Sequence, residues 1–406
     1  MALVILLAGT IVSAQAGLTP AQICAEAVPA QDPTNRTFSQ PEQVLEPGVD
    51  YRAVLCTEAG PIYVDLFEEL TPITVNSFVF LAQQGYYNNT TFHRVIADFM
   101  AQGGDPTGTG TGGPGYQFQD ELVGFLNFNV PGWLAMANAG ADTNGSQFFI
   151  TTAPTPHLDY QHTIFGEVLD GQETVAAIEL RDPATATEAG TALQTVVIVT
   201  DPTGVETTYE EPATATQDEV VTAFEGMKDT ITPDVEQLLS QETVLLNTED
   251  VIAAAPESAR QAYADLLERY GHEYHITNTV TNVGCDLDNI VFGSLGYTLD
   301  SFATRADAAA ALADPALAER LTADGFASQD SANLPYPLFT RTETVCEREM
   351  VRGLTYWQRG HFIATAHITI PADNPNIEFM DLVLNQFVGI RVYEPVLAEI
   401  LRPEIR

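Results

Sequence analysis

The chain has 406 residues, of which 45% are hydrophobic and 9% aromatic, a composition typical of folded globular proteins. This length exceeds what one hydrophobic core usually supports, so at least two domains are expected. Acidic residues number 55 against 16 lysines and arginines, which gives a net charge of −39. Such a surface repels phosphate backbones and anionic lipids, so neither nucleic acid nor an anionic membrane is expected as a main partner. The charge is typical of an exported or salt-exposed protein, and a specific basic partner is the alternative.

The first 16 residues, MALVILLAGTIVSAQA, form an apolar run that ends in small residues. This pattern is typical of a secretory signal peptide, and the run is too short to cross a bilayer comfortably. It has no lysine or arginine ahead of it, so the alternatives are a start further upstream or a segment of another kind. The sequence predicts an extracytoplasmic protein, secreted or in the cell envelope, from a bacterial source.

Four cysteines permit three pairings. In an exported chain the simplest arrangement pairs them within each region, Cys24 with Cys56 and Cys285 with Cys346. Buried free thiols are the alternative. The chain has no C-x-x-C motif, so neither a zinc site nor dithiol redox chemistry is indicated.

Residues 17–45 are rich in Pro, Gln, Thr and Ala and are expected to form a loosely packed leader. The segment YRAVLCTEAGPIYVDLF, 51–67, predicts two short strands joined as a hairpin. Thr71-Pro72 then opens a helix with apolar residues at helical spacing, which Gly85 ends. A second short helix is predicted over 170–179, and a closing strand over 193–200.

Two runs organise the region between these elements, FHRVIADFMAQGGD at 92–105 and LAMANAGADTNGSQFFIT at 134–151. The glycine-rich segment between them, 108–115, is too flexible for a helix or a central strand. Apolar strands that carry a few polar groups predict a shallow apolar pocket with a guanidinium at its rim. The side chains concerned are Arg94, Gln102, Asn138 and Gln147, beside Phe99, Met100 and Phe149.

These runs, together with PTPHLDYQHTIFGEV at 154–168, resemble the cyclophilins, which are peptidyl-prolyl cis-trans isomerases. The resemblance covers roughly residues 51–200. It implies a mainly β fold over 46–200, an eight-stranded antiparallel barrel capped by two helices, which acts on proline-containing peptide segments of client proteins. It implies no cofactor and no metal.

The resemblance also implies roles for individual residues. Arg94 would assist rotation of the prolyl bond, and His162 would line the proline pocket. The ring itself would be received by Phe99, Met100, Phe149 and Leu158. The peptide backbone would be held by Gln102 and Asn138, and the groove would be completed by Ala137, Ala139, Gln147 and Gly110. His157 stands where many members have tryptophan, a change that implies weaker binding of cyclosporin.

The chemistry agrees with this resemblance. Amide resonance gives prolyl rotation a barrier of about 18–20 kcal/mol, and the twisted amide has a nitrogen with its lone pair restored. A fixed donor to that nitrogen acts only in the transition state, and Arg94 has the right chemistry. Lowering the barrier by about 7 kcal/mol would accelerate rotation about 10⁵-fold.

Residues 201–217 are acidic, rich in Thr and Pro, and are interpreted as a linker. Residues 218–406 predict a separate α+β domain of unknown function and unknown partner. Helices are expected near 217–230, 257–270 and 303–322. Strands are expected near 272–283 and 352–370, the second range with a turn at Arg359-Gly360. An amphipathic segment is expected at 377–401. His272 and His275 would face opposite sides of a strand, so no metal site is expected there.

The sequence therefore predicts an enzyme that accelerates X-Pro isomerisation in exported proteins. One alternative is a noncatalytic module that holds proline-containing segments in the same groove. Another is that the C-terminal domain carries the main binding role and the barrel assists it.

Overall fold

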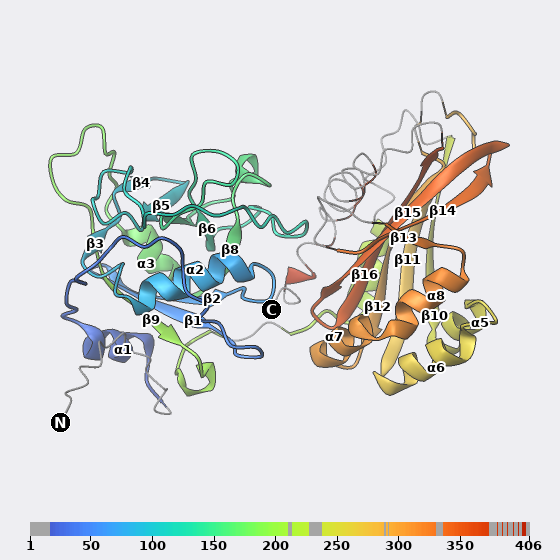
Figure 1. Ribbon diagram of the computed structural model, residues 1–406, viewed down its shortest axis with the longest axis horizontal. Helices are drawn as coiled ribbons and strands as arrows, with labels where there is room; N and C mark the ends of the chain where they lie inside the picture. Colours follow the sequence, from blue (N-terminus) through green and yellow to red (C-terminus); the bar gives the residue numbers. More distant parts are fainter. Residues whose placement is uncertain are drawn as a thin grey trace. The chain divides into compact units, whose positions relative to one another are not determined.

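The computed structural model describes residues 17–209, 213–226, 238–287, 290, 292–329 and 336–372, with 380, 384, 388, 393, 397 and 400–402. The chain divides into two compact units, Met1–Glu210 and Glu211–Arg406 (Figure 1). The expected signal peptide and most of the expected segment 377–401 lie outside the described residues. No helix among the described residues is long and apolar enough to cross a membrane.

The first unit is built on a curled antiparallel sheet of nine strands in the order β3-β9-β1-β2-β8-β6-β7-β5-β4 (Figure 1). This confirms the mainly β antiparallel architecture. The strand count is nine because the two-residue β3 forms its own pairing with β9. The strands are β1 (Arg52–Thr57), β2 (Gly60–Leu66), β3 (Thr90–Thr91), β4 (Arg94–Ile96), β5 (Met100–Gly103), β6 (Trp133–Met136), β7 (Phe148–Thr151), β8 (Ile164–Asp170) and β9 (Ala192–Val199).

Helices pack against this sheet. They are α1 (Pro20–Ala27), α2 (Pro72–Gln83) and α3 (Gln172–Ala177), with the 3-10 turns η1 (Pro156–Leu158) and η2 (Pro202–Gly204). Pro72 stands in the first turn of α2, where a missing N–H leaves no intrahelical bond unmade. Phe78 of α2 lies at the centre of the core. Its ring centroid is 5.3 Å from that of Phe165 and 5.8 Å from that of Phe148. The organising runs thus become strands that close over an aromatic core.

The expectation of a loosely packed leader is wrong. Helix α1 lies against the sheet, where a disulfide joins Cys24 to Cys56 of β1. Ile23 is buried in a small core that also contains Val54 and Tyr63. Leu18 bridges in parallel to Val205, so the segments before and after the barrel meet. The leader packs because one side of α1 is apolar and covers the outer face of β1 and β2.

The second unit is a seven-stranded antiparallel sheet in the order β10-β11-β12-β16-β15-β14-β13. Its strands are β10 (Leu239–Asn247), β11 (His272–Asn282), β12 (Ser294–Phe302), β13 (Ala327–Gln329), β14 (Leu338–Val345), β15 (Arg348–Arg359) and β16 (Phe362–Pro371). Its helices are α4 (Gln217–Gly226), α5 (Thr248–Ala254), α6 (Arg260–Arg269), α7 (Arg305–Ala313) and α8 (Pro315–Ala323). The α+β class and the turn at Arg359-Gly360 are confirmed.

The single helix expected over 303–322 is two helices, α7 and α8. Pro315 has no N–H to continue the helical ladder, so α7 ends before it. The side chain of Asp314 accepts a hydrogen bond of 3.0 Å from the backbone N–H of Ala316 and caps α8.

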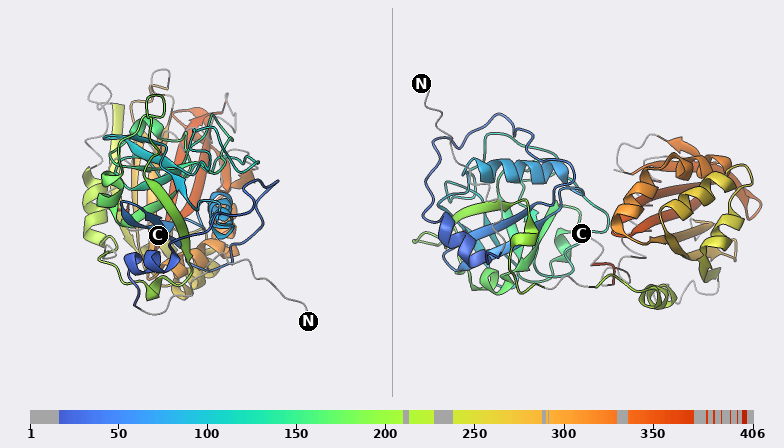
Figure 2. Two further views of the ribbon diagram at one scale, coloured as in Figure 1. Left: turned by 90° about the vertical axis from the view of Figure 1, so that its left-hand side faces the viewer. Right: turned by 90° about the horizontal axis from the view of Figure 1, so that it is seen from below.

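The central strands of the second sheet, β12 and β16, are buried along most of their length. Helices α5 to α8 cover one face and share a core that contains Tyr263, Phe302 and Phe339 (Figure 2). On β12, Tyr297 stacks on Tyr393 with ring centroids 5.2 Å apart. A second disulfide joins Cys285 to Cys346.

The prediction that His272 and His275 face opposite sides of a strand is wrong. A register shift between His272 and Tyr274 interrupts the alternation of β11. Both imidazoles therefore reach one carboxylate oxygen of Asp300, at 3.3 Å from His272 Nε2 and 2.8 Å from His275 Nδ1. Burial alone would raise the pKa of Asp300, but the two histidines outweigh it and hold that pKa well below its usual range.

Candidate active site

The strand register places three of the expected site residues in one row. Arg94 of β4 pairs with Gln102 of β5, and Gln102 pairs with Phe149 of β7. Directly paired residues in an antiparallel sheet project from the same face. A cationic, an amide and an aromatic side chain therefore lie side by side on one face of the first unit.

The guanidinium of Arg94 is held by neutral groups. Its Nη1 donates to Gln102 Oε1 at 3.4 Å and lies 4.0 Å from the sulfur of Met100. Its central carbon lies 5.8 Å from the centroid of the Phe99 ring. Among the described residues Arg94 has no carboxylate partner. Its charge is thus not neutralised by the protein and is available to a bound molecule.

Aromatic rings form the apolar socket beside Arg94. Phe149 stacks on Phe128 at 5.8 Å between centroids and meets the edge of His162 at 5.4 Å. Phe99 stacks on the exposed His157 at 5.5 Å. Sequence reasoning missed Phe128, because it lies in the irregular segment between β5 and β6, where no periodicity marks a buried position.

The ring of His162 is held by a hydrogen bond to the backbone. Its Nδ1 lies 2.9 Å from the carbonyl oxygen of Met136, and a carbonyl can only accept, so Nδ1 carries the proton. Burial lowers the pKa of His162. Burial therefore favours the uncharged form of this ring, which borders the aromatic socket at Phe149.

An amide network extends the site toward the glycine-rich loop. Gln102 Nε2 donates to Gln147 Oε1 at 3.0 Å. Gln147 Nε2 in turn donates to the carbonyl oxygens of Gly110 at 3.0 Å and Gly112 at 2.9 Å. The backbone N–H of Ala137 donates to the carbonyl of Gln147 at 2.9 Å. One glutamine thus ties together three segments that are distant in sequence.

The carboxylate of Asp105 holds the same loop by hydrogen bonds. It is fully buried, and its Oδ2 accepts from the backbone N–H of Gly110 at 2.7 Å and Gly112 at 3.1 Å. Its Oδ1 accepts from the N–H and the hydroxyl of Thr107, both at 2.8 Å. Burial would raise the pKa of Asp105, but these hydrogen bonds outweigh it and lower that pKa. Asp105 therefore serves as a structural anchor of the loop.

The segment 137–139 forms the other rim. Asn138 Nδ2 donates to the carbonyl of Gln161 at 2.8 Å, and Ala139 N–H donates to the hydroxyl of Thr143 at 2.9 Å. Leu158 is half-buried and lies with His157 on η1. The described residues include no group of three His, Cys, Asp or Glu side chains placed to hold a metal ion.

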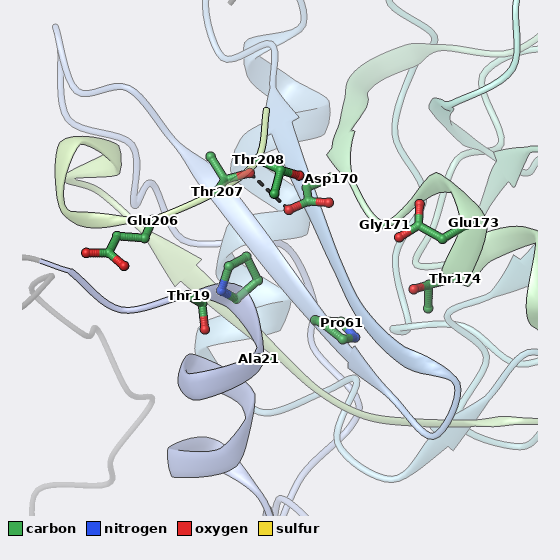
Figure 3. A pocket seen from close by; sticks show the side chains of 11 residues that line it. Thr19, Ala21, Pro61, Asp170, Gly171, Glu173, Thr174, Glu206, Thr207 and Thr208 are labelled. Carbon is green, nitrogen blue, oxygen red and sulfur yellow. Dashed lines mark hydrogen bonds between the residues drawn. The ribbon is translucent and has the colours of Figure 1, made fainter. Parts of the chain in front are cut away.

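A separate pocket of about 430 Å³ lies elsewhere in the first unit (Figure 3). Its walls come from the start of α1, from Pro61 of β2, from the start of α3 and from the segment after β9. Three carboxylates line it, those of Asp170, Glu173 and Glu206, and Asp170 accepts a hydrogen bond of 3.0 Å from the hydroxyl of Thr207. None of the expected site residues lines this pocket.

Comparison with known proteins places the barrel in a described family. Residues 53–201 match the family model for cyclophilin type peptidyl-prolyl cis-trans isomerases. Peptidyl-prolyl cis-trans isomerase-like 1 of Mus musculus is 58% identical over 118 residues, which is 28% of this chain and 71% of that protein. Peptidyl-prolyl cis-trans isomerase A of Mycobacterium tuberculosis is 52% identical over 143 residues, with 31% of this chain and 79% of that protein covered.

Solved structures include a similar protein. A cyclophilin type peptidyl-prolyl cis-trans isomerase of Cryptosporidium parvum is 36% identical, with a TM-score of 0.36, and the match covers 38% of this chain and 99% of that one. The same protein has also been solved in the presence of the dipeptide Ala-Pro.

Proposed function

This chain belongs to the cyclophilin-type peptidyl-prolyl cis-trans isomerases, and from that membership we propose that Arg94 lowers the barrier to prolyl rotation by stabilising the twisted amide. The observation that carries this proposal is the position of its guanidinium. It has no carboxylate partner among the described residues and lies beside Phe99 and Met100. A donor that a carboxylate already occupied would have little left to offer a substrate.

The mechanism follows from the change that rotation makes in the amide. Planar amide nitrogen is a poor acceptor, because its lone pair is delocalised into the carbonyl. At the twisted geometry the lone pair is localised, so an N–H donor gains a partner that the ground state lacks. Arg94 supplies that donor, while the socket around Phe149 fixes the proline ring and Gln102 restrains Arg94 at 3.4 Å. No covalent step and no proton transfer is needed.

The substrates are proline-containing peptide segments, which the cyclophilin fold binds. We further propose that the clients are exported proteins and that the chain is extracytoplasmic. Three features support this: the apolar run at 1–16, the net charge of −39, and two disulfides. Structural disulfides persist mainly in oxidising compartments. For the second unit we propose a role in binding a client or a partner, since the family match ends at residue 201.

The cis-to-trans rate of a short X-Pro peptide tests the role of Arg94 in the full chain. Arg94→Ala removes the donor, and the acceleration should fall about 100- to 1000-fold. Arg94→Lys keeps the charge but not the planar guanidinium, so a partial loss is expected. Arg269→Ala, an exposed arginine of α6, serves as the control and should retain the full rate. If folded wild-type protein binds the peptide without accelerating the exchange, the groove is a recognition site and the proposal fails.

A further inference from the structure

Two bulky apolar side chains are exposed at one edge of the first sheet. Ile96 at the end of β4 is 39% exposed, and Leu180, which follows α3, is 62% exposed. The described part of the chain has five large hydrophobic residues exposed in this way. Single exposed apolar side chains are ordinary on protein surfaces, so exposure alone would carry no inference. What distinguishes these two residues is their position.

Backbone pairing brings the two residues together. Val95 and Arg181 exchange two hydrogen bonds, from Val95 N–H to the Arg181 carbonyl at 2.9 Å and from Arg181 N–H to the Val95 carbonyl at 3.0 Å. In an antiparallel arrangement the next residue on one strand lies opposite the preceding residue on the other. Ile96 and Leu180 therefore lie across from each other and share one face.

The register also connects this pair to the proline socket. Ile96 pairs directly with Met100 of β5, so their side chains project from the same face. Arg94 lies two residues before Ile96 on β4 and shares that face too, because the exposed pattern alternates around buried Val95. The apolar surface of the proline socket therefore extends from Met100 through Ile96 to Leu180 at the edge of the sheet.

We propose that Ile96 and Leu180 form an apolar subsite for the client side chain next to the proline, on the side of the socket away from the Gln102–Gln147 network. This rests on the proposed function, since it takes the proline ring to lie beside Met100. Consecutive Cα atoms are 3.8 Å apart, and Arg94 and Ile96 are about 6.6 Å apart along a strand. A residue adjacent to a seated proline can therefore reach the pair with its side chain.

The subsite makes the enzyme selective. A leucine at that client position would bury part of its surface against Ile96 and Leu180, whereas an alanine would not. Partial burial of one such side chain predicts a kcat/KM about fivefold higher for leucine than for alanine. A client carboxylate at the same position gains no binding free energy, because the surface there is apolar and the protein is strongly acidic.

Two series of short peptides test the proposal with the full chain. One places Leu, Ala or Glu directly before the proline and the other places it directly after, so the preference can show in either chain direction. Wild type should prefer Leu to Ala about fivefold in one series. In the double variant Ile96→Ser with Leu180→Ser that ratio should fall to about one. Ile73→Ser, a substitution of a residue 40% exposed on α2, is the matched control and should keep the wild-type ratio.

A gain-of-function variant keeps the test independent of folding defects. Leu180→Arg places a cation at the subsite. The kcat/KM for the peptide with Glu should therefore rise about fivefold relative to that for the peptide with Ala. The subsite is overturned if wild type shows no Leu preference in either series, or if the preference survives the double variant. Failure of the proposed function looks different, because then the Ala peptides themselves would not be isomerised.

Discussion

Glu121 accepts two hydrogen bonds from Thr74, which lies 47 residues earlier in the sequence. The backbone N–H of Thr74 at 2.8 Å and its hydroxyl at 2.7 Å both donate to Oε2 of Glu121. Its other oxygen accepts from the backbone N–H of Ile73 at 3.1 Å. Thr71, the residue before α2, makes no side-chain cap. A carboxylate from a distant loop therefore caps the helix that covers the core of the first unit.

Glu121→Ala should destabilise the first unit by about 2 kcal/mol, because it leaves donors at the start of α2 unpaired. The measurement is urea unfolding followed by the fluorescence of Trp133, in a Trp357→Phe background so that only the first unit reports. Glu26→Ala, at an exposed position of α1 in the same unit, is the control. An unchanged midpoint for Glu121→Ala would show that the cap contributes nothing.

Gln147→Glu should weaken substrate binding. The substitution keeps the shape of the side chain but cannot donate to the carbonyls of Gly110 and Gly112. The loop would lose its link to Gln102, and we expect KM to rise about tenfold with a smaller change in kcat. Gln119→Ala, on an exposed side chain of the same unit, should leave both constants unchanged. A loss confined to kcat would contradict a role in holding the peptide.

Glu68 makes the stability of the first unit depend on pH. Burial raises the pKa of Glu68 to about 7 from its ordinary 4.5, and Asp50 and Asp65 add to the shift. Since the folded state binds this proton more tightly, the contribution of Glu68 is fully present below pH 4.5 and is lost as pH rises through about 7. Glu68→Gln should therefore raise the free energy of unfolding at pH 8.5 by about 1 kcal/mol, after discounting for solvent screening, with little effect at pH 5. An equal effect at both values would exclude titration of Glu68 as the cause.

Asp300→Asn should destabilise the second unit by about 3 kcal/mol. The largely buried carboxylate accepts from His272 and His275 through one oxygen, and an amide there would keep an acceptor but remove the negative charge that the two imidazoles contact. Fluorescence of Trp357 in a Trp133→Phe background reports on this unit during unfolding. Asp265→Asn, on the exposed side of α6, is the control. A variant as stable as wild type would show that the pair of histidines does not depend on the charge of Asp300.

Local patterns in the sequence determined much of the first unit. The runs around Arg94 and Phe149 predict strands, and Pro72 marks the start of α2, because alternation, helical spacing and proline act over a few residues. The family motifs named Arg94, Gln102, Gln147 and Phe149, and the register then placed these four side chains together. In the second unit the hairpin around Gly360 was predictable for the same local reason.

Only the tertiary structure decided the contacts that join distant segments. Nothing near Glu121 in the sequence indicates a contact with Thr74, 47 residues earlier in the first turn of α2, and nothing near Phe128 indicates a ring that stacks on Phe149. The bulge that turns His272 and His275 toward Asp300 depends on pairing with β12, which strand periodicity cannot show. The same holds for Ile96 and Leu180, which a single backbone pairing brings face to face. Periodicity records which side of an element is buried, whereas the identity of the partner is fixed only when the whole chain closes around its core.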